Sequence, residues 1–284
     1  MKDAIERKTI HCTSEYGTLK SVIVAPPTFM RIESIMNETQ KHFKNENIDQ
    51  QRATEQHNIF TETLQKNGAE VIELPANPEL NEQVFTRDIG FTIDDLLFIG
   101  AMDEPLRKQE PLLLKAWCED YGIPFHESEN GSIEGGDVLL DGERVWIGVS
   151  SRTTEQAIDA LRSELPDKQI EGISLRDGVL HLDCALNILS DSWALIYPPA
   201  FSTADIKRIQ SRFNLIPMTR AEYFNLGPNV LSIGNQTVIS LKQNKRINQE
   251  LANQGFHVIG IDFSEIIKSG GSFRCCSLPL HRGQ

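Results

Sequence analysis

The sequence predicts an α/β fold made of repeated β-β-α-β units. Three segments with the apolar spacing of helices, 154–164, 203–213 and 244–254, follow one another at intervals of about 40–50 residues. Each of them is preceded by two apolar runs typical of strands and followed by a third. A pattern repeated at this period indicates an architecture built from copies of one small unit.

Short turn sequences separate the paired strand-like runs of these units. They are Asp-Gly at 141–142, Ser-Asp-Ser at 190–192 and Gly-Asn at 234–235, and such residues favour the tight turns of β-hairpins. A looser version of the same order precedes them, with helices expected near 49–67 and 106–120. We therefore expect about five units.

A unit of this size cannot bury its own apolar face, so several units must share one core. They could stack in a line, which needs polar capping units, or close into a ring. Neither end of the sequence resembles a cap, and residues 275–280 form an apolar run typical of a strand, so a closed ring is favoured. No linker rich in Pro, Gly or Ser divides the chain, and we expect a single domain over residues 1–284.

Composition and charge narrow the classes of function. The chain has 284 residues, of which 39% are hydrophobic, and a formal net charge of -12. Nucleic-acid binders need clustered Lys and Arg, so this acidic balance argues against nucleic acid as a partner. The same charge suits a cationic substrate only weakly, because an acidic surface that keeps a protein monodisperse explains it equally.

Signals for membranes, secretion and metals are missing from the sequence. No stretch reaches the roughly 18 apolar residues that span a bilayer, and the first residues lack the apolar part of a signal peptide. Five cysteines, an odd count, fit a reducing compartment, so we expect a cytoplasmic protein with no membrane partner. Because no Cys-x-x-Cys, His-Glu-x-x-His, Gly-x-Gly-x-x-Gly or Walker motif occurs, we expect neither a metal nor a cofactor.

Four short motifs at similar places in successive units carry groups suited to catalysis. They are Phe85-Thr-Arg-Asp88, Glu134-Gly-Gly-Asp137, His181-Leu-Asp183 and Gly270-Gly-Ser-Phe-Arg-Cys275-Cys-Ser277. In a ring, matching ends of the units converge on the axis. Residues far apart in the sequence would then meet in one central pocket.

Each motif also has an ordinary structural explanation. The Arg-Asp pair of the first could be an exposed ion pair, and the two glycines of the second could supply the positive φ of a turn. The histidine of the third could be a hydrogen-bonded core residue. The two cysteines of the fourth could be small buried residues on a terminal strand.

Taken together, the motifs supply a nucleophile, an acid/base and several carboxylates, which is the set that a covalent mechanism on a cation needs. A guanidinium is planar, permanently charged and carries N–H donors in a fixed fork, so paired carboxylates can hold it and orient its carbon. The sequence therefore predicts a cysteine hydrolase that acts on a small guanidino molecule.

In these motifs and their order the chain resembles the guanidino-group-modifying, or pentein, superfamily. This superfamily includes dimethylarginine dimethylaminohydrolase, arginine and agmatine deiminases and the glycine amidinotransferases. The likeness covers nearly the whole chain, from the apolar run at 21–27 to residues 270–281, and the four motifs are specific jointly rather than singly. The resemblance implies a five-bladed pseudo-symmetric α/β propeller of ββαβ units.

The resemblance also implies roles for individual residues. Cys275, which follows a Gly-Gly pair and a short spacer, is expected to be the nucleophile, with Cys276 as its neighbour. His181 is the expected acid/base, and Glu134 the carboxylate that pairs with His181 or with the substrate. The expected substrate-binding residues are Asp88 for the guanidinium, Asp183 for its nitrogens, Arg152 for an α-carboxylate with Arg107 as a second candidate, and Glu82 for an α-amino group.

The implied reaction runs through a covalent intermediate. A Cys275 thiolate attacks the guanidinium carbon, and His181 protonates the nitrogen that leaves. Water activated by neutral His181 then hydrolyses the amidino-thioether to a ureido product such as citrulline. The expected partner is thus a small guanidino substrate, arginine or a methylarginine, while the sequence says nothing about oligomeric state.

Two features favour different members of the superfamily. Asp183 is shared with deiminases and amidinotransferases, and when buried it would lack N–H partners against a dimethylated nitrogen. A length of 284 residues is instead close to the bare five-unit core of the dimethylarginine hydrolases. We therefore expect hydrolysis of a guanidine C–N bond, with arginine deiminase, arginine dihydrolase and amidinotransferase as alternatives. A non-catalytic binding protein of the same fold is an alternative of another class, although it would have no need for Cys275 and His181.

Overall fold

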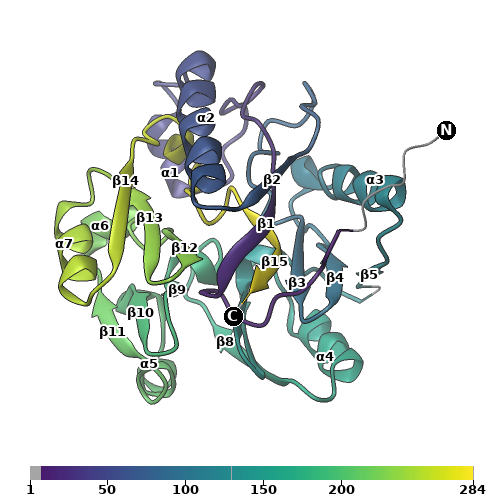
Figure 1. Ribbon diagram of the computed structural model, residues 1–284, viewed down its shortest axis with the longest axis vertical. Helices are drawn as coiled ribbons and strands as arrows, with labels where there is room; N and C mark the ends of the chain where they lie inside the picture. The colour runs from purple at the N-terminus through teal and green to yellow at the C-terminus, as the bar shows by residue number, and fades with distance from the viewer. Residues whose placement is uncertain (1–7, 129, 284) are drawn as a thin grey trace.

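The computed structural model describes residues 8–128 and 130–283, which form five three-stranded sheets around a common axis (Figure 1). In each sheet the middle strand runs antiparallel to one neighbour and parallel to the other. A helix joins each middle strand to its parallel neighbour, because parallel strands need a crossover connection rather than a tight turn. The expected five-bladed α/β propeller is confirmed.

Four blades are continuous in the sequence. Their elements are β3 (Gly90–Ile93), β4 (Leu96–Ile99), α3 (Pro111–Tyr121) and β5 (Phe125–Glu127); β6 (Val138–Asp141), β7 (Arg144–Val149), α4 (Glu155–Glu164) and β8 (Gln169–Ser174); β9 (Leu186–Ile188), β10 (Trp193–Ile196), α5 (Thr203–Gln210) and β11 (Asn214–Pro217); and β12 (Leu231–Gly234), β13 (Thr237–Leu241), α7 (Lys245–Asn253) and β14 (His257–Ile261). The helices lie around the outside of the ring (Figure 1).

The fifth blade joins the two ends of the described chain. Its middle strand β1 (Thr18–Val24) pairs in parallel with β2 (Glu70–Glu73), to which α2 (Gln50–Lys66) connects it. On its other side β1 pairs antiparallel with β15 (Leu278–Gly283). The ring is therefore closed by main-chain hydrogen bonds between distant segments, as the lack of capping units predicts.

The helices and strands differ from the predicted ranges for identifiable reasons. The helix expected near 106–120 begins at Pro111, whose ring suits the first turn of a helix but not its interior, and Pro105–Arg107 form a separate 3₁₀ turn. The helix expected over 203–213 ends at Gln210 because Phe213 turns into the core beside Ile209. The final strand begins at Leu278, so the two cysteines of the fourth motif lie in the turn before it and not on the strand.

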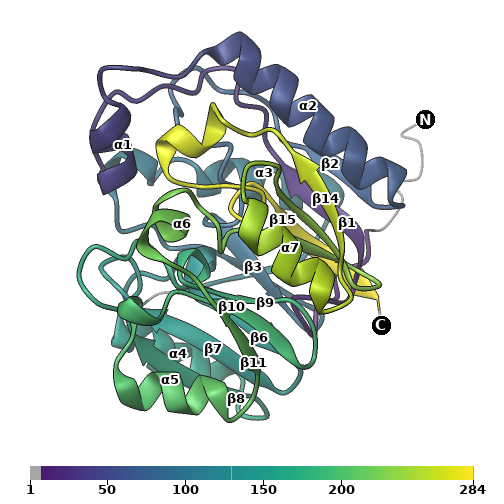
Figure 2. The ribbon, with the colours of Figure 1, turned by 90° about the vertical axis from the view of Figure 1, so that its left-hand side faces the viewer.

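Two short helices were not predicted. They are α1 (Glu38–Phe43) and α6 (Arg220–Phe224), each shorter than the window in which helical periodicity can be recognised. Both lie toward the same face of the ring, on the left of Figure 2. Among residues 8–128 and 130–283, no helix is long and apolar enough to cross a membrane.

Candidate active site

The four motifs lie immediately before the first strands of four blades. Asp88 precedes β3, Glu134 precedes β6, His181 precedes β9 and Cys275 precedes β15. Every residue of β3, β6 and β9 is buried, so these strands form the inner part of the ring and bring the motifs together. The repeat therefore turns residues far apart in the sequence into neighbours.

All eight predicted site residues are buried, and six of them line one cavity of about 20 Å³. These six are Cys275, His181, Asp88, Arg152, Arg107 and Glu82. Glu134 lies behind the ring of His181, and Asp183 lies beside the sulfur of Cys275. A cavity of this size has room for about one water, so a substrate must enlarge it.

Asn229 completes the set and was missed from the sequence. It lies just before β12, the position in the remaining blade that corresponds to the four motifs. Its Oδ1 accepts hydrogen bonds from the backbone N–H groups of Ser272 and Cys275, each at 3.1 Å, and its Nδ2 donates to the carbonyl of Asp183 at 3.4 Å. Asn229 therefore holds the cysteine loop and the His-Leu-Asp loop in one arrangement.

His181 is held as a cation by the surrounding carboxylates. Its Nε2 lies 2.8 Å from Glu134 Oε2, and its Nδ1 lies 3.5 Å from Asp88 Oδ1. Burial lowers the pKa of His181, but Asp88, Glu134 and Asp137 outweigh burial and raise it to about 10. His181 is therefore protonated at neutral pH and can donate a proton.

The two glycines of the second motif are required by close packing. Gly135 and Gly136 form a 3₁₀ turn with Asp137. Neither glycine has a positive φ, so the expectation that they supply this conformation is wrong. A Cβ on Gly136 would lie 2.7 Å from Asp88 Oδ1 and 2.8 Å from His181 Nδ1. A side chain at this position would fill the space between the two groups.

Asp88 is paired with a guanidinium of the protein itself. Its Oδ2 accepts a 2.6 Å hydrogen bond from Arg107 Nη1, while Glu110 binds the other edge of the same guanidinium. Asp88 Oδ1 is buried and has no hydrogen-bond partner among the described residues. Asp88 thus combines a fixed orientation with one oxygen that is ion-paired with His181 but accepts no hydrogen bond among the described residues.

Arg152 lines the cavity from the segment between β7 and α4. Its Nη1 is 3.5 Å from Glu134 Oε1 and its Nη2 is 3.6 Å from Glu104 Oε2. Neither separation is a hydrogen bond, and Nη1 is buried without a partner in the described part of the chain. Arg152 therefore keeps donors available for an anionic group.

Asp183 is placed next to sulfur. Its two carboxylate oxygens lie 4.0 and 3.8 Å from Cys275 Sγ, and Oδ2 is 3.3 Å from Arg274 Nε. Burial raises the pKa of Asp183, an effect that Arg274 and His181 oppose. The Asp183 carboxylate is thus close enough to accept a hydrogen bond from a group bound at Cys275.

Glu82 is a buried acid that lines the cavity. Ser269 Oγ donates to both of its oxygens, at 2.8 and 2.9 Å, and Gln40 Nε2 donates at 3.0 Å. Burial raises the pKa of Glu82 to about 8, although Arg107 and Ser269 lower it. A nearby cation would favour its ionised form, as expected for a residue that binds an amino group.

Replacing Glu82 by Gln should stabilise the protein at alkaline pH. A group whose folded pKa is raised above its unfolded value contributes fully below the unfolded value of 4.5, and loses that contribution as the pH rises through about 8. Gln resembles the protonated acid, so the free energy of unfolding of Glu82→Gln should fall less than that of the wild type between about pH 5 and about pH 9. Chemical denaturation across this range measures it. The exposed Glu79→Gln should follow the wild-type curve, and equal slopes for Glu82→Gln and wild type would contradict the assignment.

A buried ionic cluster of Glu15, Arg87 and Arg274 lies next to the site and was not predicted from the sequence. Glu15 accepts a 2.9 Å hydrogen bond from Arg87 Nη2 and another from Arg274 Nη1, and its Oε1 also accepts the backbone N–H of Leu140 at 3.0 Å. Arg87 is 4% exposed and pairs with Glu15, so the exposed Arg-Asp pair considered for the first motif is wrong. Burial would raise the pKa of Glu15, but the two arginines hold it well below its usual range.

Among the residues that the structure describes, two groups of three side chains have the spacing of metal ligands. They are Asp88, Glu134 and His181, and His181, Asp183 and Cys184, with the ligand atoms of each group within 4.8 Å of one another. Both groups share His181, whose Nε2 already bonds Glu134, and the acids already face Arg107, Arg152 and Arg274. A cation bound there would compete with these pairs.

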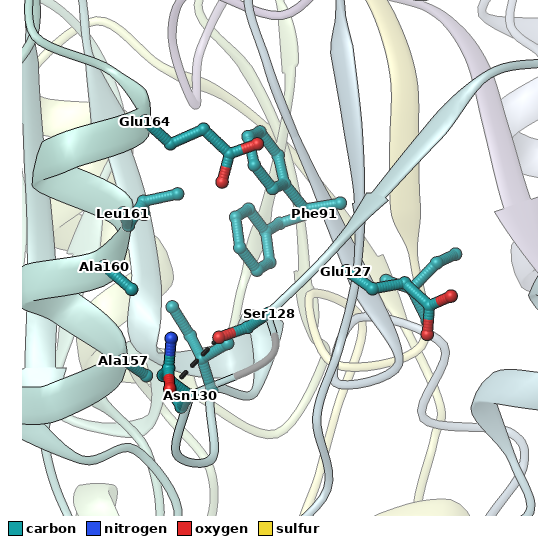
Figure 3. A pocket seen from close by; sticks show the side chains of 11 residues that line it. Phe91, Glu127, Ser128, Asn130, Ala157, Ala160, Leu161 and Glu164 are labelled. Atoms are coloured by element: carbon teal, nitrogen blue, oxygen red, sulfur yellow. Dashed lines mark hydrogen bonds between the residues drawn. The ribbon is translucent and has the colours of Figure 1, made fainter.

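A different cavity, of about 260 Å³, lies between the blade of β3, β4 and β5 and helix α4 (Figure 3). Its walls include the stacked rings of Phe91 and Phe98 and the side chain of Leu161, with Glu127 and Glu164 at its edge. None of the predicted site residues lines it. Its walls combine apolar side chains with Glu127, Ser128, Asn130 and Glu164 and contain no cysteine or histidine, so the smaller cavity at Cys275 is the candidate active site.

Comparison with known proteins gives the family. The sequence model of eukaryotic N,N-dimethylarginine dimethylhydrolases matches residues 26–282. Protein YkgA of Bacillus subtilis (strain 168) is 46% identical over 279 residues, which cover 98% of this chain and 97% of YkgA. The N(G),N(G)-dimethylarginine dimethylaminohydrolase of Mycobacterium tuberculosis is 30% identical over 237 residues, which cover 82% of this chain and 78% of that enzyme.

A solved structure shows the same fold. The N-terminal domain of ArgZ, an arginine dihydrolase of the ornithine–ammonia cycle in cyanobacteria, superposes with a TM-score of 0.84 at 24% identity, covering 93% of this chain and 98% of that domain. The structural likeness shows that the two chains share the pentein fold. The family assignment rests on the sequence model, which matches residues 26–282. The chain is therefore a pentein-fold member of the N,N-dimethylarginine dimethylhydrolase family.

Proposed function

We propose that this chain hydrolyses a guanidine C–N bond of arginine or a methylated arginine, giving citrulline with ammonia or an amine. The observation that carries the proposal is the set of unused polar atoms around Cys275. Asp88 Oδ1, His181 Nδ1 and Arg152 Nη1 are buried and have no hydrogen-bond partner within the described residues. Such atoms are costly to leave unpaired, and an amino acid with a guanidinium would supply partners for an acceptor and for a donor.

Substrate binding orients the guanidinium. Asp88 Oδ1 accepts from a guanidinium nitrogen, Arg152 binds the α-carboxylate, and Glu82 binds the α-amino group. A neighbouring hollow of about 310 Å³ shares Met36, Asn37, Arg152 and Leu180 with the cavity at Cys275. The substrate enters from this hollow, and its cationic end moves deepest, toward the sulfur.

The first chemical step forms a covalent bond. The Cys275 thiolate, stabilised by the bound cation, attacks the guanidinium carbon, and the leaving nitrogen takes a proton from His181. His181 can supply this proton because the carboxylates around it keep it charged. Glu134 stabilises the imidazolium at 2.8 Å and fixes the orientation of the ring.

The second step releases the product. Neutral His181 takes a proton from water, and the resulting hydroxide attacks the amidino carbon and displaces Cys275. A structure of an ArgZ variant is described as covalently bound to a reaction intermediate, and another, with a cysteine-to-serine replacement, as bound to substrate. These descriptions support a covalent route for the present chain. We also propose that residues 1–284 act as one catalytic domain.

The position of Asp183 favours a guanidinium without two methyl groups. The carboxylate is fully buried and within 4.0 Å of Cys275 Sγ, where it would face the nitrogens of the carbon under attack. An N–H would satisfy it, whereas a dimethylated nitrogen would leave it unpaired. Hydrolysis of a methylated arginine is the first candidate activity. Because Asp183 favours nitrogens that carry N–H groups, arginine deiminase or dihydrolase activity is the second candidate.

A direct test is turnover of arginine, monomethylarginine, asymmetric dimethylarginine and agmatine by the full chain. Both the ureido product and the released ammonia or amine should be identified, because ornithine in place of citrulline would indicate a dihydrolase. Transfer of the amidino group to added glycine would indicate an amidinotransferase. Failure to turn over any guanidine compound would support the non-catalytic alternative.

Arg152→Ala should remove the preference for arginine over agmatine. Agmatine lacks the α-carboxylate, so the wild type should prefer arginine through a charge-assisted contact of roughly 1.5–3 kcal/mol, about ten-fold to a hundred-fold in kcat/KM. The ratio of kcat/KM for the two compounds measures this contact independently of overall activity. An unchanged ratio in the variant would refute the carboxylate role of Arg152.

His181→Ala should accumulate the covalent intermediate. Hydrolysis needs a base for water, whereas a thiolate held against a cation can attack without one. Intact-mass measurement after mixing with arginine should show an adduct, and peptide mapping should place it on Cys275. Substrate binding without any adduct would argue against the covalent route.

A further inference from the structure

A second thiol lies beside the proposed nucleophile. Cys184 ends the 3₁₀ turn Leu182–Cys184, and its Sγ is 3.5 Å from Asp183 Oδ1. Cys275 Sγ is 4.0 Å from the same oxygen. The two sulfurs thus converge on one buried carboxylate, although they belong to segments of different blades.

We propose that Cys184 is a resolving thiol for Cys275, so that hydrogen peroxide converts the pair into a reversible Cys184–Cys275 disulfide. The proposal rests on the proposed function only in taking Cys275 as the reactive thiol. It assigns Cys184 a role that the hydrolytic reaction does not use.

The size of the cavity selects the oxidant. Cys275 lines a space of about 20 Å³, which admits a molecule the size of water without the enlargement that a substrate or a bulky thiol such as glutathione would need. Peroxide can therefore reach the sulfur when no substrate is bound. A sulfenic acid formed there is shielded by burial from bulky external thiols, so a thiol within the protein is its nearest partner.

Cys184 is better placed than Cys276 to be that partner. Consecutive α-carbons lie about 3.8 Å apart across a trans peptide, which is shorter than the 4.4–6.8 Å found in disulfides. A Cys275–Cys276 bond would therefore distort the backbone. The pKa of Cys184 is raised well above its ordinary value, first by the interaction of Cys184 with Cys275 and then by burial. Cys184 therefore remains a thiol until a sulfenic acid is present on Cys275.

The oxidation balances in two steps. The Cys275 thiolate attacks one oxygen of peroxide, the O–O bond breaks, and the sulfur is oxidised to a sulfenic acid while the other oxygen leaves as hydroxide and takes up the proton that the Cys275 thiol lost, giving water. Cys184 then loses its proton to Asp183 Oδ1 and attacks the sulfenic sulfur. The S–S bond forms, the S–O bond breaks, and the departing hydroxide takes that proton to become a second water.

The test uses the full reduced chain, which is treated with hydrogen peroxide while folded, then unfolded so that reagents reach the buried thiols, alkylated with N-ethylmaleimide and mapped by mass spectrometry. The expected result is a linked pair of peptides containing Cys184 and Cys275, with loss of alkylation at both and recovery of both on reduction with dithiothreitol. Because the readout is a bond and not turnover, it is independent of whether the substrate has been identified. Protection by arginine tests the proposed function separately.

Variants distinguish a resolving thiol from simple proximity. In Cys184→Ser and Cys184→Ala, peroxide should drive Cys275 to a sulfinic acid that dithiothreitol does not reverse. In the matched control Cys276→Ser, the Cys184–Cys275 link should form as in the wild type. A Cys275–Cys276 link, irreversible oxidation of Cys275 in the wild type with Cys184 still open to alkylation, or no change at either thiol would each overturn the proposal.

Discussion

Cys275→Ser should lower kcat/KM for the preferred guanidine substrate by at least about a thousand-fold, because a serine hydroxyl is a far weaker nucleophile at neutral pH than a thiolate. Its fold should survive, since the backbone N–H of residue 275 still bonds Asn229 and the side chain is only slightly smaller. Steady-state kinetics and thermal unfolding of the same preparation measure the two effects.

Cys276→Ser is the matched control for this variant. Cys276 is fully buried and packs in the apolar cluster that also contains Phe85 and Phe273. It does not line the cavity at Cys275, so its replacement should affect stability more than turnover. If Cys276→Ser is inactive and Cys275→Ser retains turnover, the nucleophile is Cys276.

Glu15→Gln should cost about 3–5 kcal/mol of the free energy of unfolding, the effect of removing one partner from a buried ion pair. The substitution keeps the shape of the side chain but leaves Arg87 and Arg274 without their shared counter-charge. Both guanidiniums are buried at 4% exposure or less, so water cannot replace the carboxylate. Chemical denaturation at neutral pH gives the value.

The comparison for Glu15→Gln is Glu62→Gln on the surface of α2. Glu62 pairs with Lys66 one helical turn away at 60% exposure, and such pairs contribute only about 0.3–0.5 kcal/mol. A loss for Glu15→Gln no larger than that for Glu62→Gln would show that the buried cluster does not hold the blades together.

The sequence predicts the repeat and the motifs that carry the candidate site residues because both depend on local patterns. Helical and strand periodicities repeat from unit to unit, and each motif precedes a first strand. Ring closure then makes their meeting a geometric consequence. Asn229 could have been found by the same logic, because it occupies the corresponding position before β12. Asparagine, however, is neither a nucleophile nor an acid/base, so nothing in the sequence marks it as a candidate site residue.

The ionic contacts could not be predicted, because they depend on which way neighbouring side chains point. Arg87 and Asp88 are adjacent in the sequence, yet Arg87 bonds Glu15 below the site while Asp88 bonds Arg107 at the cavity. Glu15 lies before β1, outside the repeated unit, and nothing in its neighbourhood indicates a buried partner. Such pairs are set by the assembled ring and not by the segments that contribute to it.

The pairing of β15 with β1 has a consequence for how the protein is made. About 250 residues separate Val24 from Leu278, and joining segments so far apart costs about 5 kcal/mol in loop-closure entropy. On the ribosome β1 is synthesised early and waits with one edge unpaired until β15 emerges. Cys275 immediately precedes β15, so the nascent chain carries the acids and His181 long before it carries the proposed nucleophile. On the proposed function, folding and activation finish in the same event, and a chain interrupted during synthesis lacks both a closed ring and the proposed nucleophile.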